Sequence, residues 1–278
     1  MSLEVIAVVL LAALMHAGWN TLAKRNFGGG DAVVVGVLAA WPALLALPFV
    51  GVPARAAWPM LAASALIHIA YFRVLARAYE RGELSVAYPL MRGVPPLVVA
   101  AVAAVLFGEM LSTPAWMGVA VLVGGVLVLG WDGLSAGTLH ARSIRYVGIQ
   151  IAVIAAYTLV DGAGVRASGN PFAYIVWLFV LIAIALVVST PAPLVAAYRA
   201  GGRTLAIAAV GGALTFGSYA AALWAMTQAP VALVAALRET SSLFGAVFAA
   251  WFLGERFGAT RWAALVLIVG GVAAMRLA

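Results

Sequence analysis

The sequence predicts an all-α integral membrane protein in which ten transmembrane helices form two inverted five-helix repeats. Three observations favour this fold class: an apolar composition, ten long apolar runs, and a match between the two halves of the chain. Of the 278 residues, 66% are hydrophobic and only 9% are charged, and the mean hydropathy is +1.12. A soluble domain carries about a quarter charged residues. This chain could not cover itself with polar surface in water, so its expected solvent is lipid.

The composition also excludes several kinds of chemistry. Basic residues are spread among short connectors, so the isoelectric point near 10.2 indicates membrane topology, and we expect no nucleic-acid partner. The absence of cysteine excludes disulfides and thiolate metal sites, and no metal or cofactor is expected. The first residues lack a basic leader and include Glu4, which predicts a retained first span.

Ten apolar runs each have about the 20 residues that a helix needs to cross the hydrocarbon core. They are separated by proline, glycine and charged clusters. The runs are continuously apolar and do not alternate, which favours helices over a β-barrel. The predicted spans cover approximately residues 3–23, 32–50, 57–79, 84–107, 113–130, 146–166, 172–196, 204–226, 230–252 and 258–276.

The connectors predict how the spans are organised. Connectors as short as residues 80–83 make consecutive spans antiparallel neighbours. The longest connector lies at the midpoint of the chain. It divides the sequence into a first five-helix repeat at residues 1–131, a linker at 132–145 and a second repeat at 146–278.

An internal repeat supports this division. A shift of 146 positions aligns residues 84–129 with 230–275 without a gap, and 12 of the 46 aligned residues are identical. The alanine, leucine and valine identities carry little weight in so biased a composition. The informative matches are Arg92 with Arg238, Gly108-Glu109 with Gly254-Glu255, Trp116 with Trp262, and Gly124-Gly125 with Gly270-Gly271. Because five is odd, the second repeat enters the membrane in the opposite direction, and a substrate site is expected near the midplane.

Two motifs connect this pattern to a known family. The first span contains Trp19-Asn20 followed by Lys24, and a Gly-Glu pair closes the fourth and ninth spans. Over essentially its whole length the chain resembles the EamA-type drug/metabolite transporter superfamily, most closely the bacterial amino-acid and metabolite exporters and their aromatic amino-acid branch. The resemblance implies a secondary exporter of small metabolites in the cell inner membrane. It implies neither an enzyme nor one substrate, since members carry amino acids, nucleotide sugars or triose phosphates.

Basic residues predict the orientation. The connectors after spans one, three, five, seven and nine carry Lys24, Arg25, Arg81, Arg142, Arg145, Arg199, Arg203, Arg256 and Arg261. The other side carries only Arg55, Arg166 and Arg276. This asymmetry favours cytoplasmic basic connectors and places both termini outside.

A few charged residues fall inside the predicted spans, where each costs roughly 2.5–3.5 kcal/mol on insertion scales. These are Arg73, Arg92, Asp161, Arg238 and Glu239. Two interpretations of Arg92 and Arg238 stay open. Either arginine could bind a substrate carboxylate or phosphate, or the two could neutralise Asp161 and Glu239 or extend to the membrane interface. Adjacent helical positions point about 100° apart, so Arg238 and Glu239 are not expected to face one cavity together.

Prolines mark the fourth span as irregular. Pro89, Pro95 and Pro96 surround Arg92, and proline removes a backbone donor, so this span is expected to kink or unwind. A broken helix beside a buried arginine is typical of a transporter site. By contrast, the fifth and tenth spans are almost wholly apolar, with glycine pairs for close packing, and are expected to form a scaffold.

Polar and aromatic residues at helical spacing are expected to face one central cavity. The candidate substrate-binding residues are His16, Trp19, Asn20, His68, Tyr79, Tyr88, Arg92, Tyr157, Asp161, Tyr219, Trp224 and Arg238. Asp161 and Glu239 are also candidates for proton coupling, and the sequence leaves proton antiport and uniport both open. For any single tyrosine, bundle packing is the alternative interpretation.

Two other functions were weighed. An intramembrane enzyme would need a nucleophile with its base, and the nearest such group is Ser241 and Ser242 beside Glu239, with no histidine close in sequence. A passive channel fits a repeat and a broken helix less well than alternating access. The expected partners are a small-molecule substrate and the bilayer, and the protein is expected to be a monomer or homodimer.

Overall fold

The computed structural model describes residues 1–26, 31–81, 91–129, 141–253 and 258–277, and the regular structure in these ranges is entirely helical. The elements are α1 (Leu3–Asn26), α2 (Asp31–Leu38), α3 (Ala40–Ala46), η1 (Leu47–Phe49), η2 (Arg55–Ala57), α4 (Trp58–Arg81), α6 (Pro95–Leu106), α7 (Thr113–Leu129), α9 (Ala141–Ala167), α10 (Pro171–Ser189), α11 (Ala192–Ala200), α12 (Gly202–Gln228), α13 (Val231–Arg238), α14 (Ser241–Leu253) and α15 (Ala259–Leu277). The all-α prediction is therefore confirmed for the described residues.

Six helical segments in the described residues are long and apolar enough to cross a membrane. They are Leu3–Leu22, Ala32–Phe49, Arg55–Leu75, Arg145–Ala167, Pro171–Ser189 and Gly202–Gln228. Met91–Leu106, Thr113–Val128 and Trp262–Leu277 are shorter apolar helices at three further predicted spans. The chain is a multi-pass membrane protein, whereas the count of ten spans stays a prediction.

Several predicted spans are not single helices. The span expected at 32–50 is divided into α2, α3 and η1. The span expected at 172–196 ends as α10 at Ser189, because Pro191 interrupts it, and α11 follows as a separate helix. The span expected at 230–252 is divided into α13 and α14. In addition, α9 begins at Ala141, inside the predicted linker 132–145, most of which lies outside the described residues.

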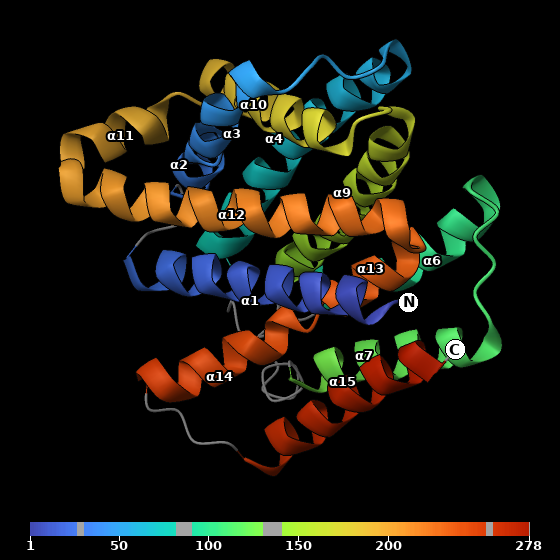
Figure 1. Ribbon diagram of the computed structural model, residues 1–278. Coiled ribbons are helices and arrows are strands. Elements are labelled where there is room, and N and C mark those ends of the chain that lie inside the picture. Colours follow the sequence, from blue (N-terminus) through green and yellow to red (C-terminus); the bar gives the residue numbers. More distant parts are fainter. Residues whose placement is uncertain (27–30, 82–90, 130–140, 254–257, 278) are drawn as a thin grey trace.

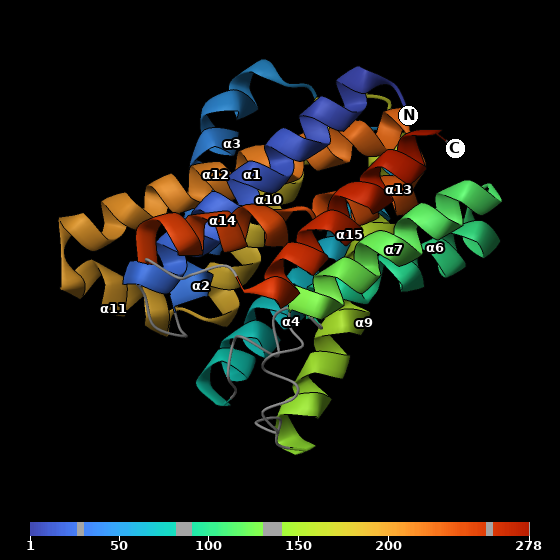
Figure 2. The ribbon, with the colours of Figure 1, turned by 90° about the horizontal axis from the view of Figure 1, so that it is seen from below.

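The helices pair in a regular way (Figures 1 and 2). Helices α1 and α12 lie side by side and run in opposite directions, and α4 packs against α9. In a five-plus-five arrangement these are spans one with eight and three with six, which are equivalent pairs. Helix α6 packs against α13, which joins spans four and nine. Two equivalent halves would produce this pattern, so it supports the repeat inferred from the sequence.

The directions of α7 and α15 and the positions of the two chain ends are relevant to whether the repeat is inverted. Helices α7 and α15, the predicted fifth and tenth spans, run antiparallel to each other (Figure 1). The start of α7 and the start of α15 therefore lie at opposite ends of this pair. The start of α1 and the end of α15 lie on the same side of the molecule, as an even number of spans requires (Figure 2). An inverted repeat predicts both features.

Glycines bring α7 and α15 together. A Cβ on Gly271 would lie 2.6 Å from the backbone nitrogen of Leu122, and one on Gly125 would lie 2.9 Å from the carbonyl oxygen of Ala264. Their sequence neighbours Gly124 and Gly270 face open space. A Cβ added to either would have no atom of another described residue within 4 Å. Only one glycine of each pair is therefore required by the packing.

Gly125→Ala and Gly271→Ala should each destabilise the protein by about 1–3 kcal/mol, because the added methyl group meets backbone that cannot move aside. Thermal unfolding in detergent measures the effect.

Gly124→Ala and Gly270→Ala are the matched controls and should be neutral or slightly stabilising, since alanine is the better helix former. Equal destabilisation by all four substitutions would contradict this account of the interface.

Candidate functional site

A cavity lies among α1, α2, α4, α9, α10, α12 and α13. Its empty space is about 580 Å³, including the part open to the outside. The lining residues are His16, Trp19, Val35, Gly36, Ala39, His68, Tyr71, Phe72, Tyr157, Phe179, Ile182, Thr215, Ser218, Tyr219 and Arg238. Tyr71, Phe179 and Ser218 lie near the middle of α4, α10 and α12, so the cavity lies at the depth where an inverted repeat would hold its substrate.

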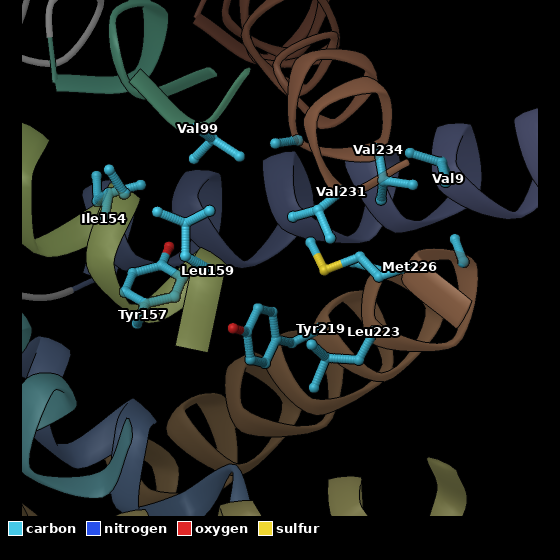
Figure 3. Close-up of a cluster of buried hydrophobic side chains, with 14 of the residues drawn as sticks. Val9, Val99, Ile154, Tyr157, Leu159, Tyr219, Leu223, Met226, Val231 and Val234 are labelled. Carbon is cyan, nitrogen blue, oxygen red and sulfur yellow. The ribbon is translucent and has the colours of Figure 1, made fainter. Parts of the chain in front are cut away.

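Aromatic rings form the walls of this cavity. The His68 ring centroid lies 4.8 Å from that of Tyr157 and 6.0 Å from that of Tyr219. Tyr157 and Tyr219 are 5.9 Å apart, and Figure 3 shows them side by side, projecting from α9 and α12. Phe179 lies 6.1 Å from Tyr219 on the α10 side. These edge-on and tilted contacts give flat apolar walls with a few polar tips.

Arg238 contributes the positive charge of the cavity. It is the last residue of α13, its side chain is almost fully buried, and its guanidinium carbon lies 5.2 Å from the Tyr219 ring centroid. No carboxylate in the described ranges forms an ion pair with it. A buried cation is costly without a partner, so the site is suited to an anionic group from a ligand.

Arg92 is neutralised within the protein. Its Nη2 lies 3.0 Å from Oε1 of Glu239, and both side chains are about 5% exposed. The pair lines a second, smaller cavity of about 250 Å³ that shares Tyr157 and Arg238 with the larger one. The expectation that Arg238 and Glu239 would not face one cavity together is wrong, because both line the smaller cavity. Glu239 follows the end of α13, where the regular helix stops, and it reaches across to Arg92, while Arg238 also lines the larger cavity.

The helix breaks at equivalent positions of the two predicted repeats. The expected irregularity of the fourth span is confirmed, because the chain bends at Val94 before α6 begins at Pro95. The ninth span breaks at Thr240, which is 146 positions further on and has no proline nearby. Here the backbone nitrogen of Thr240 donates to the carbonyl of Leu237, three residues back, and the Thr240 hydroxyl donates to the same carbonyl. This local bonding replaces the regular helical pattern.

Asp161 lies behind the cavity wall. It is fully buried on α9 and lines neither cavity. Its Oδ1 accepts a hydrogen bond of 2.8 Å from the Tyr174 hydroxyl, and its Oδ2 accepts one of 2.5 Å from the Tyr219 hydroxyl. A substrate in the cavity would meet Tyr219 before it met Asp161.

The structure brings most of the other candidate residues together. Trp19 and His16 line the cavity and are joined by a hydrogen bond of 3.1 Å from Trp19 Nε1 to His16 Nδ1. Asn20 instead donates to the His16 carbonyl within α1, and Trp224 packs at the edge of the core. Tyr88 and the side chain of Tyr79 lie outside the described residues.

Some lining residues were not among the candidates. Phe179 and Ile182 come from α10, whose sequence is uniformly apolar, so no polar contrast marks its inner face. Gly36 was missed as well, although a Cβ there would overlap the Phe72 ring, which shows that α2 approaches α4 closely. An isolated glycine within an apolar run was the only available signal.

A second ionic cluster joins α9 to the junction of α12 and α13. Arg166, near the end of α9, pairs with Glu109 and donates to the carbonyls of Met226 and Ala229 at the end of α12. Glu109 also accepts from the backbone nitrogen of Val231, the first residue of α13, at 2.8 Å. The equivalent Gly254-Glu255 corner lies outside the described residues.

In the described part of the chain, no group of three or more His, Asp or Glu side chains is placed to hold a metal ion.

The fold and site define a class: a multi-pass helical membrane protein with a mid-depth cavity. Residues 145–277, from α9 to α15, match the EamA-like transporter family. The match covers slightly less than half of the chain and is a similarity to that family.

The overall fold has a counterpart among solved structures. One described only as "Crystal structure of protein" is 17% identical in sequence, with a TM-score of 0.73, and the similarity covers 99% of this chain and 97% of the other. At that identity the similarity supports the fold alone. The comparison with curated proteins finds no match.

The Arg92–Glu239 pair can be tested by a double-mutant cycle. Arg92→Gln and Glu239→Gln should each destabilise the protein by about 3–5 kcal/mol, because each leaves a buried charge unpaired. The double variant should lose much less than the sum of the two. Unfolding in detergent provides the measurement, and strictly additive losses would show that the residues do not act as a pair.

Proposed function

We propose that the protein is a secondary transporter that exports small metabolites, with amino acids, including aromatic ones, as its substrates. The observation that carries this proposal is the buried guanidinium of Arg238 in an aromatic-walled cavity. A guanidinium binds a carboxylate through two parallel hydrogen bonds. Every α-amino acid presents a carboxylate, and the rings of Tyr157, Tyr219 and Phe179 provide flat surfaces for its side chain.

Alternating access across the inner membrane is the mechanism that we infer. Three observations support it. The cavity lies at the middle of its helices, the fourth and ninth spans break at matching positions beside Arg92 and Arg238, and the Glu109–Arg166 cluster bonds α9 to the junction of α12 and α13. Broken helices at a mid-depth site are typical of transporters that open to one side at a time.

A second substrate class has an observation in its favour. No acidic residue of the described chain lines the larger cavity, so nothing there balances the ammonium group of an amino acid. Glu239, which lines the smaller cavity, is the nearest candidate for that role. Another anionic metabolite or drug, such as a monocarboxylate or a phosphate ester, would need only Arg238. A proteoliposome screen of labelled amino acids, monocarboxylates, sugars and nucleotides, with and without a pH gradient, separates these classes.

Arg238→Ala should reduce uptake of the substrate found in this screen by at least about tenfold, which corresponds to about 1.4 kcal/mol of lost interaction. The variant should remain folded and monodisperse, since among the described residues no carboxylate forms an ion pair with this arginine and would be left unpaired.

Arg77→Ala is the matched control, because Arg77 is an exposed arginine of α4 that lies outside the cavity. It should transport like the unmodified protein. Normal uptake by Arg238→Ala would remove this arginine from the mechanism.

A further inference from the structure

Asp161 is a buried carboxylate that the transport path described so far does not use. Resting on the proposed function, we propose that Asp161 is a positioning residue: through Tyr219 it fixes Arg238 in the geometry that selects carboxylate substrates. Two contacts carry this proposal. The Tyr219 hydroxyl on α12 donates to the Asp161 carboxylate on α9, and the Arg238 guanidinium at the end of α13 lies over the Tyr219 ring.

The first step is the fixation of the Tyr219 ring. Its hydroxyl donates to Asp161 Oδ2, while its ring contacts those of Tyr157, His68 and Phe179 at centroid distances of 5.9, 6.0 and 6.1 Å. The ring contacts alone restrict its tilt. The hydrogen bond to a charged acceptor fixes the direction of the hydroxyl end as well.

The second step is the fixation of Arg238. Its guanidinium lies over the face of the Tyr219 ring, and no carboxylate of the described residues forms an ion pair with it. An arginine side chain has many rotamers, and a cation over an aromatic face is held by the charge distribution of that ring. Donation of the phenol proton toward a carboxylate increases the electron density of the ring and strengthens this attraction.

The charge balance supports the same assignment. The buried charged residues of the described chain are Arg92, Asp161, Arg238 and Glu239, two of each sign. Glu239 lies on Arg92 at 3.0 Å, and Asp161 is held by the hydroxyls of Tyr174 and Tyr219. Because the Tyr219 ring lies between Asp161 and Arg238, the Asp161 carboxylate does not occupy the hydrogen-bond donors of the guanidinium. The guanidinium therefore keeps its donors for a substrate.

The chain offers a matched pair of variants. Tyr219→Phe and Tyr174→Phe each remove one hydroxyl that donates to Asp161, and both rings are buried. Tyr219 touches Arg238, whereas Tyr174 lines neither cavity. A role limited to stability predicts similar effects from both, and a positioning role predicts an effect of Tyr219→Phe alone. Asp161→Asn tests the carboxylate directly.

The readout is selectivity for the carboxylate. Uptake of labelled L-phenylalanine into proteoliposomes is compared with that of L-phenylalaninamide, in which the carboxylate is neutralised, over a range of concentrations. The ratio of kcat/KM for the acid to that for the amide should fall by about tenfold in Tyr219→Phe and Asp161→Asn, through KM for the acid, as expected for a misplaced charged hydrogen bond. Tyr174→Phe should keep the ratio of the unmodified protein.

The outcomes separate this inference from the proposed function. If the unmodified protein prefers the acid and Arg238→Ala removes that preference, the proposed function stands. If Tyr219→Phe and Asp161→Asn then keep the preference, or Tyr174→Phe loses it equally, the positioning role is overturned. If the unmodified protein carries neither probe, or carries both equally, the proposed amino-acid function fails and this inference fails with it.

Discussion

The structure depends on how four buried charges are balanced inside an apolar bundle. A chain with 9% charged residues has few to place in its interior, and each costs free energy unless a partner lies close. Glu239 meets Arg92 directly, in a contact that joins the chain before α6 to the junction of α13 and α14. Arg238 faces a tyrosine ring, with Asp161 on the far side. The first arrangement holds the two halves together, and the second leaves a cation available to the cavity.

The surrounding helices explain why such a site can form in this composition. Glycine lets the Phe72 ring of α4 pack directly on α2 and brings α7 and α15 to backbone contact, so these helices lie close together. The aromatic residues are concentrated where the helices separate around the cavity. Tyrosine and histidine suit this position because each presents an apolar face and a polar edge.

Much of the fold could be predicted from the sequence, and less of the site. Long apolar runs and prolines predicted the helices and the bend beside Arg92, because both signals are local. The break at Thr240 has no proline and depends on hydrogen bonds that form only in place. Phe179 and Ile182 lie in a helix that is apolar on all sides, so no polar residue in its sequence indicates which face lines the cavity. Asp161 was recognised as unusual, but its position behind Tyr219 depends on the packing of three helices.

The Glu109–Arg166 cluster has a mechanical consequence. Arg166 donates to the last carbonyls of α12, and Glu109 accepts from the first amide of α13. The corner between these two helices is therefore bonded to α9 at several points. Because these bonds share the same two side chains, we expect α9, the end of α12 and the start of α13 to move together in any conformational change. The break at Thr240, where the regular helical hydrogen bonds are interrupted, is then where we expect the chain to bend.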